Sequence, residues 1–102
     1  MKKYPIERKA FETWLGTHYR DIVGTPTDPC DCPMVRFIQA TMPLTRVNVG
    51  SRDWHAETDR GVTFQPLPSW ARKLVGAVDF RFGKDKTLPV TGQAVLGILE
   101  GI

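Results

Sequence analysis

The sequence predicts a compact α+β fold for residues 1–102, a single globular domain with about four short helices and one antiparallel β-hairpin. Four segments space their apolar residues as one face of a helix does, and two short segments alternate apolar and polar residues as a strand does. The composition, 41% hydrophobic and 25% charged, is typical of a globular chain. The chain contains no internal repeat, low-complexity segment or linker.

The first predicted helix covers residues 5–19. Pro5 suits a first helical turn, where a backbone N–H is not needed. One stripe of this helix is apolar and is formed by Ile6, Ala10, Phe11, Trp14 and Leu15. A short apolar segment at residues 22–23 follows and is expected to turn inward. The prolines and aspartates of residues 25–32 indicate a loop.

The second predicted helix covers residues 33–42. Pro33 favours the first helical position, which makes Cys32 the N-cap, and Pro43 ends the helix. Because this region joins a turn to a short apolar helix between two other structured segments, we expect the core to form around it.

Residues 46–50 and 61–65 each alternate apolar and polar side chains and are predicted to pair as the antiparallel hairpin. Between them, residues 51–60 are polar and charged apart from Trp54 and Ala56, and we interpret them as a long loop. A lone hairpin is marginally stable, so it must pack against the helices.

The third predicted helix covers residues 69–79, and residues 80–88 form a basic connection with a glycine turn. Thr91 is a good N-cap for the last helix. The apolar stripe of that helix consists of Val95, Ile98, Leu99 and Ile102.

Composition and motifs exclude several classes of function. The net charge of +3 permits a nucleic-acid partner without requiring one. No apolar run approaches the ~20 residues of a membrane span, and no secretory signal is visible. Two cysteines one residue apart favour reduced thiols, so we expect a cytoplasmic protein without a membrane partner. Nucleotide-binding and hydrolase signatures are absent, so we expect no enzyme activity and no cofactor.

The favoured function is a small non-catalytic accessory protein that binds another protein. Trp54 stands among polar residues, and tryptophan and arginine are enriched at binding hot spots, so Arg52, Trp54 and His55 are the predicted contact residues. An equally weighted alternative is that Trp54 folds back over the hairpin as a lid on the core. Self-association as a homodimer is also left open.

The first alternative function is nucleic-acid binding. Aromatic and basic residues interleave along residues 80–86, as they do on surfaces that stack bases and contact phosphates. The candidate residues are Arg72, Lys73, Arg81, Lys84 and Lys86. Asp79 and Asp85 interrupt this patch, which makes it the less favoured hypothesis.

The second alternative is a thiol enzyme or redox switch at Cys32. A helix N-terminus favours the thiolate, whereas the neighbouring Asp28 and Asp31 oppose it and the sequence places no histidine beside it. A buried structural cysteine is the favoured interpretation. A metal site is not expected, because the spacing of its candidate ligands does not match zinc-site patterns. Those ligands are Cys30, Cys32, His18 and His55.

Several short segments of the chain together carry a resemblance. They are residues 11–15 (FETWL), 32–38 (CPMVRFI), 67–71 (LPSWA), 78–79 (VD) and 90–94 (VTGQA). In these segments the chain resembles a family of small uncharacterised proteins, about 100 residues long, of bacteria and their phages. The resemblance implies a shared fold and an accessory role, and it brings no activity or site residues with it.

Overall fold

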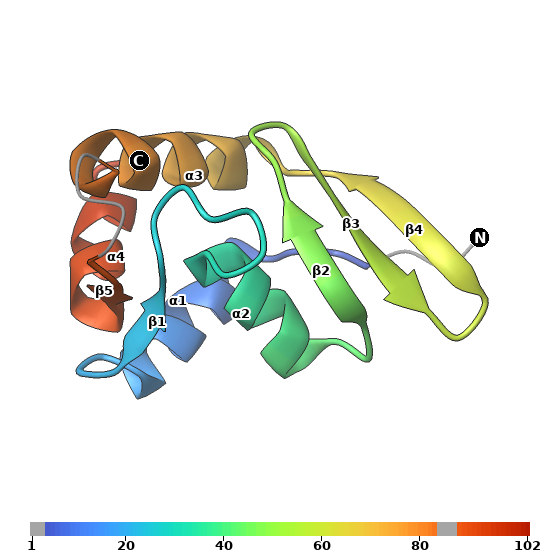
Figure 1. The fold of residues 1–102 in the computed structure, drawn as a ribbon. Coiled ribbons are helices and arrows are strands. Elements are labelled where there is room, and N and C mark those ends of the chain that lie inside the picture. The colour runs from blue at the N-terminus through green and yellow to red at the C-terminus, as the bar shows by residue number, and fades with distance from the viewer. Residues whose placement is uncertain (1–3, 84–87) are drawn as a thin grey trace.

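The computed structural model describes residues 4–83 and 88–102. Within them it forms four helices and two small antiparallel sheets, so the predicted α+β class and the four helices are confirmed (Figure 1). The elements follow one another as α1 (Arg8–Thr17), β1 (Ile22–Gly24), α2 (Pro33–Thr41), β2 (Thr45–Val49), β3 (Asp53–Thr58), β4 (Gly61–Pro66), α3 (Ser69–Phe82), β5 (Val90–Thr91) and α4 (Gly92–Leu99).

The larger sheet has three strands in the order β2-β3-β4. Its central strand β3 occupies most of the segment that we expected to be a loop, and that expectation was wrong. The predicted pairing of residues 46–50 with 61–65 was also wrong, because β2 and β4 each pair with β3. The segment alternates in the manner of a strand, with Trp54 and Ala56 buried on one face and Asp53, His55 and Glu57 on the other. The charges of the solvent-facing side had suggested a loop. In Figure 1 the sheet projects from the helical part of the molecule, and β4 forms its far margin.

The smaller sheet pairs β1 with β5 and brings distant parts of the chain together. Ile22 lies opposite Thr91, and Gly24 lies opposite Val90. The N–H of Gly92 donates to the carbonyl of Asp21 at 3.1 Å, which extends the contact. The short apolar segment predicted at residues 22–23 is therefore part of strand β1. Its pairing with β5 holds the start of α4 in place.

Most helix signals in the sequence are confirmed, but the expectation for Pro5 was wrong, because α1 begins at Arg8 and Pro5 lies before it. Cys32 is the N-cap of α2 and Pro33 its first residue. Thr91 caps α4, where its Oγ1 accepts from the N–H of Ala94 at 3.3 Å. Helix α3 continues to Phe82, so residues 80–82, which we expected in a connection, form its last turn.

Aromatic side chains hold the helical part of the core together. Phe11 is fully buried, and its ring centroid lies 5.1 Å from that of Phe37, 5.6 Å from Trp70 and 6.0 Å from Trp14. Burying such rings is the main favourable contribution to folding in a chain of this size. None of the helices in the described ranges is both long and apolar enough to traverse a bilayer.

Candidate functional site

The three residues predicted to contact a partner do not lie together on the surface. Trp54 is 1% exposed, and its ring packs edge-on against Tyr4 with the centroids 6.3 Å apart. Its placement is that of the core alternative, so its side chain has almost no surface to offer a partner. Arg52 is exposed just before β3, and His55 lies half-buried on the opposite face of the strand from Trp54.

The face of the β2-β3-β4 sheet that carries His55, which we name the outer face, has an exposed apolar centre. Phe64 lies directly opposite His55 in the β3–β4 register, and their ring centroids are 5.4 Å apart. Phe64 is 74% exposed, and Val62, two residues before it on the same face, is 56% exposed. Sequence reasoning missed both residues, because the alternation in β4 does not say which face of the strand is turned to the core and which to solvent.

Polar groups border this apolar centre on the side of β2. Arg46 lies in the bulge between β2 and β3 with a φ of 50°, and its Nε is 3.4 Å from Oε2 of Glu57. Asn48 lies opposite His55, and its Nδ2 donates to Sγ of Cys30 at 3.4 Å. An apolar patch with a polar rim is the arrangement that protein contact surfaces use.

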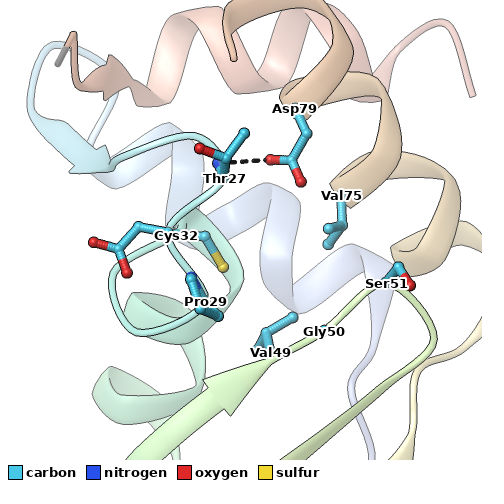
Figure 2. A pocket seen from close by; sticks show the side chains of 9 residues that line it. Thr27, Pro29, Cys32, Val49, Gly50, Ser51, Val75 and Asp79 are labelled. Carbon is cyan, nitrogen blue, oxygen red and sulfur yellow. Dashed lines mark hydrogen bonds between the residues drawn. The ribbon is translucent and has the colours of Figure 1, made fainter. Parts of the chain in front are cut away.

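A cavity of about 210 Å³ borders Cys32 (Figure 2). The loop before α2 lies on one side of it, and Val75 and Asp79 of α3 lie on the other. Oδ1 of Asp79 accepts from the backbone N–H of Thr27 at 2.9 Å and so links the two sides. The cavity is therefore a seam between the loop and α3 with a thiol at its edge.

The environment of Cys32 makes its thiol a poor nucleophile. Burial raises the pKa of Cys32 to about 11, the charge of Asp79 acts in the same direction, and the backbone N–H groups of Val35 and Met34 at the start of α2 only partly oppose them. A thiol with this pKa is protonated at neutral pH, whereas reactive cysteines have lowered pKa values. The geometry thus favours the structural interpretation of Cys32.

The weaker metal-site candidates do not converge. Cys30 is exposed and Cys32 is buried, and both are free thiols. Nδ1 of His18 is 3.1 Å from Oδ2 of Asp21 at the end of α1, whereas His55 faces Phe64 on the sheet. In residues 4–83 and 88–102, no group of three or more histidine, cysteine or acidic side chains could hold a metal ion.

Part of the predicted basic patch lies on helix α3. The solvent-facing stripe of this helix contains Arg72, Lys73 and Phe80, and Arg81 is exposed beside it. Phe80 is 87% exposed, the highest value among the large apolar side chains described. Lys84 and Lys86, the other two candidates, lie outside the described residues.

The chain matches no protein-family model, no curated protein and no solved structure. The resemblance to small proteins of bacteria and phages therefore stays a prediction.

Proposed function

We propose that this protein is a small non-catalytic accessory protein that binds another protein through the outer face of its β2-β3-β4 sheet. The observation that carries the proposal is the exposed pair of Phe64 and Val62 beside His55. Both cysteines are free thiols, which supports placing this activity in the cytoplasm. The resemblance to small bacterial and phage proteins is in keeping with an accessory role.

The energetics favour Phe64 as the anchor of the contact. Fully burying a phenylalanine side chain contributes about 1.5–3 kcal/mol relative to leaving it exposed. A half-buried imidazole and a β-branched neighbour flank it and would fill the space around it in a complex. The ion pair of Arg46 and Glu57 supplies the polar rim that fixes orientation.

Peptides selected from a library can serve as probes of the outer face. A library of random peptides displayed on phage is selected on immobilised protein, and the enriched peptides are measured against Phe64→Ser. We expect affinity to fall at least tenfold, because a tenfold change corresponds to ~1.4 kcal/mol, less than the burial of one phenylalanine. Phe80→Ser is the matched control, since it removes another largely exposed phenylalanine from a different part of the molecule.

Two outcomes would count against the outer face. Selection could yield no enriched peptide, or the enriched peptides could bind Phe64→Ser as well as they bind the unaltered protein. Loss of binding in Phe80→Ser alone would move the contact surface to α3. Trp54→Ala is unsuitable as a probe, because removing this buried ring would destabilise the fold by about 3–5 kcal/mol.

We also propose nucleic-acid binding on α3 as a second candidate function. One specific observation favours it. Arg72, Lys73 and Phe80 share one exposed stripe of α3. The acidic residue of this helix, Asp79, accepts a hydrogen bond from Thr27 and does not pair with Arg72 or Lys73. A cationic helix face with an exposed aromatic ring can contact phosphates and stack a base at the same time.

Binding of a fluorescent single-stranded oligonucleotide at several salt concentrations tests this candidate. We expect the affinity to fall as salt rises, and Arg72→Gln to reduce the slope of log affinity against log salt by about 0.7. Phe80→Ser should weaken binding about tenfold through lost stacking, whereas Phe64→Ser serves as the control without effect. Binding that is independent of salt would contradict the candidate.

A further inference from the structure

Strand β4 presents an edge that, among the described residues, pairs with β3 on one side only. The N–H of Leu67 donates to the carbonyl of Arg52 at 2.9 Å, which identifies the pairs that exchange hydrogen bonds with β3. Because such pairs alternate along antiparallel strands, Thr63 and Gln65 direct their backbone groups to β3. The N–H and C=O groups of Val62 and Phe64 therefore point to the open edge.

The position of Pro66 is consistent with this alternation of hydrogen-bonded and non-hydrogen-bonded pairs. Pro66 lies opposite Asp53 at a position where no N–H is needed for the β3–β4 ladder. The open edge of β4 thus offers the hydrogen-bonding groups of two consecutive outward positions, Val62 and Phe64, before the proline interrupts it.

The geometry points to a second copy of this chain as the occupant of the edge, and we propose a two-fold symmetric dimer in which β4 pairs antiparallel with β4 of the other copy. This inference deepens the proposed function, because it names a partner for the strand that carries Phe64. If Thr63 lies opposite Thr63 of the second copy, Val62 of each chain lies opposite Phe64 of the other. The outward N–H and C=O groups of Val62 and Phe64 in each copy then pair with those of Phe64 and Val62 in the other. Pro66, which has no N–H, takes no part in this pairing.

The side chains of the outer face suit this register. On the outer face this register creates two symmetry-related pairs, each with Val62 of one chain opposite Phe64 of the other. A β-branched residue opposite an aromatic one is a favourable cross-strand pair. The two outer faces become continuous, with each Phe64 flanked by His55 of its own chain and Val62 of the other. The interface is isologous, so it closes after two copies and does not extend into a fibre.

The distribution of charge is the argument for a second copy over an unrelated strand. β4 contains no charged residue, whereas natural edge strands that avoid self-pairing usually carry one. Along the chain its nearest charges are Asp59 and Arg60 in the turn between β3 and β4, and across the ladder Glu57 and Asp53 of β3 lie opposite Val62 and Pro66, on the side away from the open edge. In the proposed register Arg60 and Asp59 come opposite the uncharged Pro66 and Leu67 of the other copy, so like charges do not meet directly.

Charge reversal at Thr63 tests the dimer. Thr63 is opposite its own symmetry mate in a pair that does not exchange hydrogen bonds, where side chains approach most closely. We expect sedimentation velocity of the unaltered protein to show a shift with rising concentration from 11.5 kDa towards twice that mass. Thr63→Lys alone and Thr63→Asp alone should remain monomeric, and an equimolar mixture of the two should dimerise again.

Controls separate the dimer from misfolding and from the proposed function. Thr63→Val should keep the dimer, and circular dichroism should show that both charged variants are folded. A protein that stays monomeric at millimolar concentration, a dimer that persists in both charged variants, or a mixture that fails to associate would each overturn the proposal. His55→Ala should weaken peptide binding and leave the dimer intact, so failure of either proposal is visible without the other.

Discussion

Arg36 holds Asp31 through two parallel hydrogen bonds, with Nε 2.8 Å from Oδ1 and Nη2 3.2 Å from Oδ2. The same guanidinium donates to the carbonyl of Ile22 at 3.2 Å. Side-chain and backbone oxygens of two different segments thus converge on one cation of α2. This contact fixes the loop that carries both cysteines against the start of the helix.

The Asp31–Arg36 pair makes stability depend on pH. The hydrogen bond from Arg36 lowers the pKa of Asp31, and burial only partly opposes it. Because the native pKa lies below the unfolded value, the contribution is fully present above about pH 4 and is lost as the pH falls through the native pKa. Asp31→Asn should lower the free energy of unfolding at neutral pH by no more than about 1 kcal/mol, since both side chains are more than a third exposed.

Urea denaturation at neutral pH and near the acid limit checks this prediction. The difference between Asp31→Asn and the unaltered protein should shrink as the pH falls. Asp59→Asn, in the exposed turn of the β3–β4 hairpin, is the control and should show little difference at either pH. A difference that persists unchanged in acid would mean that Asp31 acts through its shape and not through its charge.

The two thiols should differ sharply in reactivity. Cys30 is exposed, whereas Cys32 is 6% exposed with a pKa raised to about 11. Iodoacetamide should therefore modify Cys30 alone in the folded protein, as read by intact mass. Because the native pKa of Cys32 is raised, its contribution to stability is complete below the ordinary thiol pKa and disappears as the pH rises through about 11.

A Cys30→Ser variant gives the cleaner reading. It should stay unmodified until urea unfolds it, and its rate of modification should then follow the unfolded fraction. Rapid alkylation of folded Cys30→Ser at neutral pH would instead support a thiol function for Cys32.

Three helix glycines have room for a side chain, and Gly16 near the end of α1 is one of them. A Cβ added at Gly76 in α3 or at Gly97 in α4 would meet nothing within 4 Å. Since glycine in a helix interior costs about 1 kcal/mol relative to alanine, Gly76→Ala and Gly97→Ala should each raise the free energy of unfolding by roughly 0.5–1 kcal/mol. Thermal unfolding followed by circular dichroism measures this.

Gly92 supplies the contrasting case. A Cβ there would lie 2.4 Å from the carbonyl oxygen of His18 and 2.6 Å from that of Leu15, both backbone atoms that cannot move aside cheaply. Gly92→Ala should therefore lower stability even though alanine favours helices. Equal effects at Gly92 and Gly97 would show that propensity, and not packing, decides both.

Arg8 joins the first helix to the last. Its guanidinium donates to the carbonyl of Leu99 at 2.8 Å and to that of Ile102 at 2.9 Å. The Leu99 carbonyl also accepts from the backbone N–H of Ile102 at 3.0 Å, so Arg8 adds to the hydrogen bonds at the end of α4. Arg8→Ala should cost about 1–2 kcal/mol, because hydrogen bonds from a charged donor are stronger than neutral ones but this donor is partly exposed. Chemical denaturation gives the value.

Glu12→Ala is the matched control for Arg8. It removes only the surface ion pair within α1, in which Nε of Arg8 and Oε1 of Glu12 are 3.1 Å apart, and leaves the bonds to α4 in place. Its cost should be ~0.2–0.5 kcal/mol. A cost as large as that of Arg8→Ala would show that the bond to α4 contributes little.

Local signals in the sequence were sufficient for the helix boundaries that depend on local chemistry. Pro33 and Thr91 mark helix starts because ring geometry and a capping hydroxyl act within one turn. Strand β3 was missed because charged residues on its outer face concealed the inward pair of Trp54 and Ala56. The alternation of apolar and polar residues typical of a strand was present in this segment, but its many polar and charged residues favoured the interpretation as a loop.

The candidate site was less accessible to sequence reasoning, for a geometric reason. Phe64 alternates with Thr63 and Gln65 just as a core residue would, but it lies on the outer face of the sheet, opposite the face that buries Trp54 and Ala56, and is therefore exposed. Trp54 shows the converse, since polar neighbours in sequence become the solvent-facing side of its strand. Which face of a sheet is covered is set by long-range packing, which no short segment encodes.

The pairing of β1 with β5 also has a consequence for how the chain folds. Ile22 and Thr91 are neighbours in space but are separated by most of the sequence, so closing this contact carries a large loop-closure entropy. The meander of β2, β3 and β4 contains only near-neighbour contacts and can form early, on a microsecond scale for a hairpin. We expect the small sheet and the docking of α4 on α1 to form late, so a nascent chain would expose Val23 and Leu15 until β5 and α4 have been synthesised.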